Sequence, residues 1–219
     1  MWCVSEITPK YREAMNDVLT LYEKPYQSDE PVVCFDEKSL QLLAEKREPR
    51  PMRQGMPFRR DYEYVRKGTV NVFCAVEPKA GRHLTGIHPY RKAVDFAEFL
   101  AWLAERYPNT RTIHLVMDNL NTHQQTSLEK RFGLQRGKEI WNRFTPHYTP
   151  VHASWLNQAE IEVGLIARQC LKRRRFATLG EVREELQAWN LRANQKQVKI
   201  NWTFTSQKAS ADFADKRGN

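Results

Sequence analysis

The sequence predicts an α/β protein with a mixed β-sheet flanked by helices. Short apolar or β-branched runs alternate along the chain with segments whose apolar residues recur at helical spacing. The expected order is three strands, helix, strand, helix, strand, helix, which is typical of a sheet covered by helices. The chain has 219 residues, of which 41% are hydrophobic and 11% aromatic, so it can bury a sizeable core.

The first half of the chain supplies one helix and the first group of strands. A helix is expected from Pro9 to Tyr22, because its apolar residues fall on one face. After a linker, the β-branched run PVVCFDEKS predicts a strand that ends at Asp36. The basic, proline-containing segment from Arg47 to Lys67 is expected to be irregular. Turns at Lys67-Gly68 and at 78–81 would then join three short strands, Tyr62 to Val65, Thr69 to Val76 and Arg82 to His88.

The second half alternates helices with strands. The apolar run that begins at Ile113 predicts a buried strand that delivers Asp118 at its end. A capping box formed by Thr178 and Glu181 begins the last long helix, and the segment from Trp202 to Phe204 is expected to pack back on the body. The other expected elements are helices from Ala93 to Tyr107, Gln124 to Phe132 and about Leu156 to Arg173, and a strand from Ile140 to Phe144.

Charge and cysteine usage narrow the class of protein. The formal net charge is +9, from 35 Lys and Arg against 26 Asp and Glu, which favours a protein that meets phosphates. The four cysteines show no CxxC spacing, so we interpret them as reduced core residues. No segment resembles a signal peptide or a membrane span, and we expect no membrane partner and a cytoplasmic location.

Three acidic positions suggest a metal-dependent active site. Asp36 and Asp118 each follow an apolar strand, and Glu160 or Glu162 lies on the helix expected after Leu156. Oxygen ligands of this kind are those that hard divalent ions prefer, and two such ions can promote in-line displacement at a phosphodiester. Glu37 competes with Asp36, because adjacent strand residues point to opposite faces. Taken alone, a turn or capping role explains Asp118 better, and Asp36 could equally be a turn residue at a strand end.

Longer motifs around these acids carry a family resemblance. The strings CFDEKS, VMDNLNTH and HYTPVHASWLNQAEIE resemble the acidic motifs of DDE transposases, specifically the bacterial insertion sequence 630 family, related to mariner elements. The resemblance runs from about Trp2 to Phe213. It implies an RNase H-like fold with a five-stranded sheet, Mg²⁺ or Mn²⁺ as cofactor, and Asp36, Asp118 and Glu160 as catalytic metal ligands. It also implies a helix and linker at 1–30 and the catalytic domain at 31–219.

The resemblance further implies DNA partners, and the residues around the acids suggest supporting roles. Transposon ends and target DNA are the expected substrates, bound by a homodimer in a bacterial, nucleoid-associated setting. Asn119 and His123 are expected to support Asp118. The basic residues expected to contact DNA phosphates are Arg59 and Arg60, and the run Lys172, Arg173, Arg174 and Arg175, which we expect to continue the Glu160 helix.

One departure from the family leaves alternatives open. Transposases of this kind carry helix-turn-helix modules before the catalytic domain, and this sequence begins just upstream of that domain. A separate upstream product is therefore an expected partner for recognition of transposon ends, and a truncated remnant is the competing interpretation. The alternative functions are an RNase H-like nuclease or integrase that cuts without transposing, and a catalytically silent DNA-binding fragment that acts as a regulator.

Overall fold

The computed structural model describes residues 8–214, with side chains through residue 211. Its centre is a five-stranded sheet in the order β3-β2-β1-β4-β5. The strands are β1 (Val32–Glu45), β2 (Tyr64–Glu77), β3 (Arg82–His88), β4 (Ile113–Met117) and β5 (Phe144–Tyr148). β1, β2 and β3 are antiparallel, whereas β4 and β5 run parallel to β1. The predicted mixed sheet flanked by helices is confirmed.

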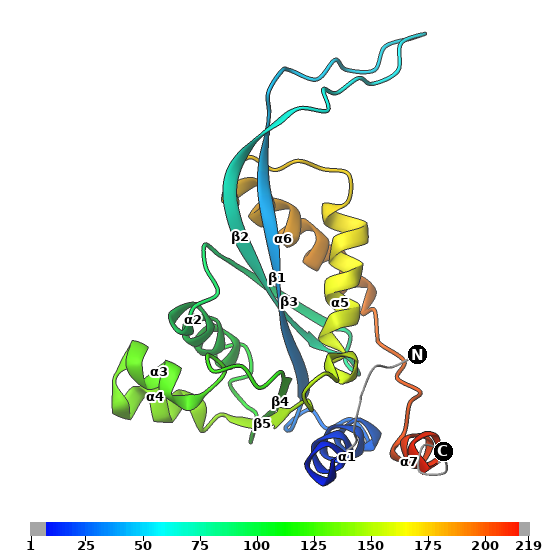
Figure 1. The fold of residues 1–219 in the computed structure, drawn as a ribbon. Coiled ribbons are helices and arrows are strands. Elements are labelled where there is room, and N and C mark those ends of the chain that lie inside the picture. Colours follow the sequence, from blue (N-terminus) through cyan, green and yellow to red (C-terminus); the bar gives the residue numbers. More distant parts are fainter. Residues whose placement is uncertain (1–7, 215–219) are drawn as a thin grey trace.

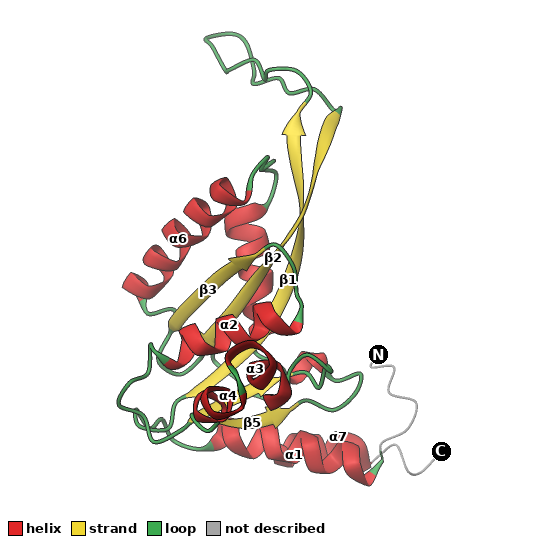
Figure 2. Cartoon of the chain, turned by 90° about the vertical axis from the view of Figure 1, so that its left-hand side faces the viewer, coloured by secondary structure: helices red, strands yellow, loops and turns green. Residues whose placement is uncertain are grey.

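Helices cover both faces of the sheet because alternate strand residues are apolar on both sides. One face carries α2 (Ala93–Ala104), α3 (Gln125–Phe132) and α4 (Leu134–Trp141), packed on the side chains of Phe35 and Phe73. The opposite face carries α1 (Pro9–Glu23), α5 (Ala159–Ile166) with its π-helical extension at 167–171, and α6 (Leu179–Lys196). Figure 2 shows α2, α3 and α4 together in front of the sheet.

The C-terminal segment returns to the N-terminal helix. Trp202 and Phe204 pack against the cluster that contains α1, Cys34 and Val116, as the sequence predicted. A last helix, α7 (Ser206–Ala214), lies beside α1 in Figure 1 and contacts it. None of the helices within residues 8–214 is long and apolar enough to cross a membrane. Cys34, Cys74 and Cys170 are free and buried, as expected, and Cys3 lies outside the described residues.

The sequence suggested that the first strand ends at Asp36, and this prediction is wrong. The strand β1 continues for nine further residues to Glu45. It continues because β2 pairs with it from Cys34↔Val76 as far as Glu45↔Tyr64. The predicted turn at Lys67-Gly68 is also wrong, since both residues lie inside the single strand β2. Gly68 has φ +97°, and the β1–β2 register shifts opposite it, so this glycine marks a bulge rather than a turn.

Two boundaries in the second half also differ from the prediction. The segment Ile140 to Phe144 is not a strand, because α4 runs to Trp141 and β5 begins only at Phe144. Pro146 lies within β5, and it is tolerated there because β5 is an edge strand. The helix expected from Leu156 to Arg173 begins at Ala159, after a 3₁₀ turn at 154–156, and ends at Leu171.

The β1–β2 hairpin extends far beyond the rest of the sheet. The segment 46–63, which we call the arm, joins the two strands and projects away from the domain in Figure 1. Two isolated bridges, Arg50↔Arg59 and Arg53↔Met56, are its β-type pairs. The arm contains six basic and three acidic residues, and its residues 50–60 are all exposed. The expectation of an irregular basic segment is therefore confirmed for the arm, whereas Tyr64 to Lys67 belong to β2.

Candidate active site

Asp36 and Asp118 meet where β4 stops pairing with β1. The parallel ladder runs from Val32↔His114 to Cys34↔Val116, so Asp36 lies two residues past the last paired position on β1 and Asp118 two residues past it on β4. β4 itself ends at Met117, and Asp118 begins the loop that follows. Parallel strands bring equivalent positions to the same level of a sheet. The two aspartates therefore converge although Asp36 is in the middle of a strand.

Glu160 reaches the same place from the first turn of α5. The Asn157 side chain fixes this turn, because its Nδ2 donates to the Phe35 carbonyl at 2.7 Å while its Oδ1 accepts from the Ala159 amide at 3.1 Å. Asn157 is buried and joins the residue before Asp36 to the start of α5. Asn157 is the supporting residue that sequence reasoning missed; its position, three residues before an acid in the SWLNQAE phrase, was the available signal.

Burial and neighbouring charges both act on Asp36. Burial raises the pKa of Asp36, the Glu37 amide that donates to its Oδ1 at 2.7 Å lowers it, and the negative charges of Asp118, Glu160 and Glu37 raise it further. The result is a pKa of about 6 instead of 3.8. Mutual repulsion among carboxylates at one place is the usual condition of a divalent-cation site before the cation binds.

The carboxylates are nevertheless not drawn together into a finished coordination shell. Within residues 8–214, no three His, Cys, Asp or Glu side chains are close enough to hold an ion as they stand. The chemistry of the donors still fits a hard divalent ion, because all three are carboxylates and Glu160 is on the exposed side of its helix. Asp36, Asp118 and Glu160 are the side chains here that could hold such an ion.

The second glutamate of the motif points away from these acids. Glu162 is fully buried, and its Oε1 lies 2.5 Å from Nδ1 of His83 on β3. The other nitrogen of His83 lies 2.9 Å from the Val198 carbonyl. Arg168 lies elsewhere, over Gly164 on the helix surface. The buried Glu162–His83 pair fixes the rotation of α5 and leaves Glu160 facing outward.

His123 lies between Asp118 and Glu37, with one ring nitrogen in contact with each residue. Nδ1 lies 2.6 Å from Oδ1 of Asp118 and 3.2 Å from its carbonyl oxygen, and Nε2 lies 3.1 Å from Oε1 of Glu37. Burial opposes the charged ring, but the contacts with Asp118 and Glu37 outweigh burial and raise the pKa of His123 to about 9. The ring is therefore an imidazolium between two carboxylates at neutral pH. Asn119, the other expected supporting residue, is exposed.

The basic residues expected to contact DNA fall into two groups. Arg59, Lys172 and Arg173 are exposed. The others already bind protein groups: Arg60 binds Glu45 and the Arg173 carbonyl, Arg174 binds Glu185, and Arg175 binds Glu45 and the carbonyls of 61–63. The prediction that residues 172–175 continue the Glu160 helix is wrong. The helix ends before them, because Lys172 has an extended ψ of 135°.

The mixed five-stranded sheet flanked by helices is similar in fold to the RNase H-like catalytic domain of Mos1 transposase. The sequence model of the family described as DDE superfamily endonuclease matches residues 31–183, which is more than half of the chain. The chain therefore belongs to the DDE superfamily endonucleases. The narrower resemblance to the insertion sequence 630 family stays a prediction.

Solved transposase structures share the fold. The Mos1 transposase paired-end complex with left transposon end has 16% identity and a TM-score of 0.56, covering 90% of this chain and 62% of that chain. The Mos1 mariner paired end complex with Mn has 14% identity and a TM-score of 0.58, covering 90% and 61%. The chain thus spans about three fifths of the Mos1 chains. No curated protein matches the sequence.

Proposed function

We propose that this domain cuts DNA phosphodiester bonds and joins the resulting ends to target DNA, as the catalytic part of a transposase. The observation that carries the proposal is that Asp118 and Glu160 lie close enough to Asp36 for their charges to add to burial in raising the pKa of Asp36. Membership of the DDE superfamily endonucleases and the structural similarity to transposase–DNA complexes support the same function.

Asp36, Asp118 and Glu160 are the residues that would hold Mg²⁺ or Mn²⁺. Similar structures were solved as complexes with each of these ions. When bound, such ions stabilise the negative charge that develops on the attacking and leaving oxygens of a phosphodiester. The chain supplies no covalent nucleophile in this scheme, so water attacks for cleavage and a DNA 3′-hydroxyl attacks for joining. In each case one P–O bond forms, one breaks, and the leaving oxygen takes up a proton.

The protein also has to hold DNA against these acids. The arm carries Arg50, Arg53 and Arg59 on an exposed segment, and Lys172 and Arg173 lie exposed after the extension of α5. Phosphate contacts of this kind position a duplex without reading its sequence. We therefore assign general DNA binding to this chain, and we assign recognition of transposon ends to a helix-turn-helix partner. A homodimer in the DNA complex remains part of the proposal.

Cleavage of a supercoiled plasmid tests the enzymatic part. With Mg²⁺ or Mn²⁺ the chain should convert supercoiled plasmid into nicked circles, and EDTA should stop the reaction. Asp118→Asn should abolish nicking while DNA binding persists, because the amide keeps the shape but removes the charge. Glu139→Gln, an exposed change on α4, is the matched control and should cut normally.

Joining is tested separately with a short duplex that carries free 3′-hydroxyls and a plasmid target. Joined products would support strand transfer, whereas nicking without joining would leave the hydrolytic nuclease. DNA binding without nicking in either metal would refute catalysis and favour the silent regulatory fragment.

A further inference from the structure

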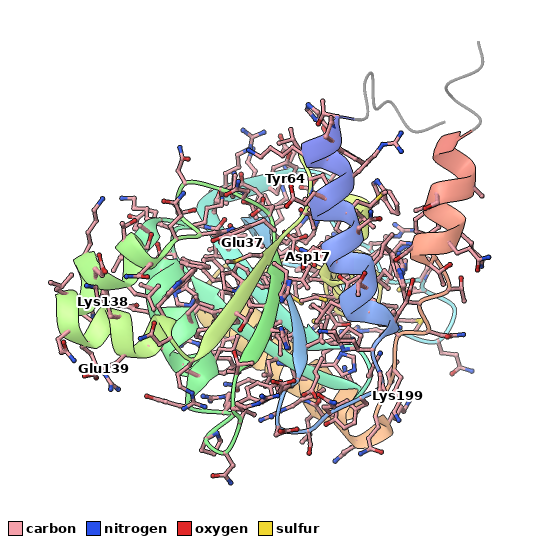
Figure 3. All side chains as sticks on the ribbon, turned by 90° about the horizontal axis from the view of Figure 1, so that it is seen from below. Asp17, Glu37, Tyr64, Lys138, Glu139 and Lys199 are labelled. Carbon is pink, nitrogen blue, oxygen red and sulfur yellow. The ribbon has the colours of Figure 1, made fainter. Side chains whose placement is uncertain are left out.

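Glu37 lies on the opposite side of β1 from Asp36, beneath the helices α2 and α3. Its side chain is 6% exposed and its Oε1 is 3.1 Å from Nε2 of His123. Figure 3 shows Glu37 near the middle of the molecule, whereas Glu139 lies at the edge on α4. A carboxylate buried among aromatic side chains is costly unless it is paired. Its one ion pair among the described residues is with His123, so the function of Glu37 has to be sought through that ring.

The imidazole of His123 is held on every side. It stacks on Phe96 with ring centroids 4.6 Å apart and meets Phe35 edge-on at 5.4 Å. The backbone amide of His123 donates to the Leu120 carbonyl, and the backbone carbonyl of His123 accepts from the Tyr148 hydroxyl at 3.0 Å. A ring confined in this way cannot rotate without breaking the pair with Glu37. It therefore acts as a rigid spacer between β1 and the loop after β4.

Of the three residues in contact, Glu37, His123 and Asp118, it is Asp118 whose orientation the fold leaves least constrained. It lies beyond the end of β4, and its side chain is 43% exposed, so the strand alone does not fix its orientation. His123 engages Oδ1 at 2.6 Å. None of the residues that the structure describes bonds Oδ2, which leaves that oxygen for an ion. Groups that orient a ligand in this way contribute to metal affinity although they do not touch the metal.

We infer that Glu37 is a positioning residue that, through His123, fixes the Asp118 carboxylate for metal binding and DNA cleavage. The inference rests on the proposed function, because it assigns Asp118 as a metal ligand. The division of labour follows from the alternation of β1: Asp36 faces the metal side of the sheet, and Glu37 faces the other side and holds the second aspartate in place. Loss of Glu37 should loosen Asp118 without removing any ligand.

The test measures Mn²⁺ binding to the full chain, by electron paramagnetic resonance of the free ion, together with plasmid nicking across a Mn²⁺ series. Glu37→Gln keeps the size of the side chain but removes its charge. It should raise the Mn²⁺ concentration needed for half-maximal binding and nicking by about 10- to 100-fold, the range usual for groups that orient metal ligands. Nicking at saturating Mn²⁺ should be largely restored. Glu139→Gln, equally an acid-to-amide change, should leave both midpoints unchanged.

Two substitutions of His123 separate the contacts. His123→Asn places an amide where Nδ1 was and can keep the contact with Asp118, whereas His123→Gln reaches toward Glu37 and abandons Asp118. Both should weaken Mn²⁺ binding, and His123→Gln should weaken it more. Adding Glu37→Gln to His123→Asn should not weaken Mn²⁺ binding further, because the contact between residue 123 and Glu37 is already lost. If Glu37 has a purely structural role, Glu37→Gln should instead weaken Mn²⁺ binding equally in the wild-type chain and in His123→Asn.

The outcomes are distinguishable. If the wild-type chain binds Mn²⁺ and nicks DNA, and Glu37→Gln has wild-type midpoints, the inference is overturned and the proposed function stands. If the wild-type chain does neither, both are overturned. If Glu37→Gln fails to fold, the comparison of His123→Asn with His123→Gln decides, and equal midpoints for that pair would overturn the inference.

Discussion

Replacing Asp36 by asparagine should stabilise the metal-free protein while destroying its activity. The pKa of Asp36 is about 6 in the folded chain, against 3.8 for an ordinary aspartate. A difference of about two pKa units corresponds to about 3 kcal/mol against the ionised form at neutral pH. Because Asp36 is partly exposed, solvent screening reduces this to about 1–2 kcal/mol. Asparagine has no charge to bury, and its Oδ1 can still accept from the Glu37 amide.

The sign of the pH dependence follows from linkage. The folded state holds the proton on Asp36 more tightly than the unfolded state, so the wild-type chain loses stability relative to the variant as pH rises from about 4 to about 6. The two proteins should unfold alike near pH 4, and Asp36→Asn should be more stable by about 1–2 kcal/mol at pH 7.

Urea unfolding in EDTA at several pH values is the direct measurement. Added Mn²⁺ should then stabilise the wild-type chain and have little effect on Asp36→Asn, because a ligand has been lost. A variant that is equally or less stable than wild type at pH 7 without metal would show that burial and the neighbouring acids do not raise the pKa of Asp36 in solution.

Three further predictions concern the elements around the site. Glu160→Gln should reduce metal-dependent cleavage by several orders of magnitude and leave thermal stability normal. Glu162→Gln should lower the melting temperature, because the His83 pair is lost, yet leave cleavage by the folded fraction largely intact. The reverse pattern would move the third ligand to Glu162. Asn157→Ala should lower the free energy of unfolding by about 1–3 kcal/mol in urea titrations, because the Phe35 carbonyl loses its donor; an unchanged value would show that water replaces the amide. DNA affinity, measured by fluorescence anisotropy, should fall steeply with salt and differ little among sequences; tight, salt-resistant, selective binding would contradict the phosphate model.

The sequence was most informative where local pattern and tertiary packing agree. The helix from Pro9 and the buried strand from Ile113 were predicted because their apolar residues follow one clear period. The capping role of Thr178 was likewise correct, since its hydroxyl accepts from the Glu181 amide at 3.2 Å. Membership of the DDE superfamily endonucleases came from the longer motifs around the acids rather than from periodicity.

The errors arose where a distant partner decides the structure. No local feature shows that β1 continues past Asp36, since DEKSLQLLAE becomes a strand because β2 pairs with it. Gly68 resembles a turn residue until the register shift of the opposite strand shows it to be a bulge. The pairing of Glu162 with His83 joins residues 79 apart in the chain, and no spacing rule brings them together.

The construction of the arm has a consequence for how this protein can diverge. Both ends of the arm are fixed by the β1–β2 ladder, which continues to Glu45↔Tyr64, whereas its outer part has only the bridges Arg50↔Arg59 and Arg53↔Met56. Its length is therefore nearly independent of the packing that places Asp36. Insertions or deletions at Gly55 would alter how far basic side chains reach along a duplex while the free energy of folding stays almost constant. The length of the arm and the stability of the domain are therefore separate properties of this chain, and selection can change one without the other.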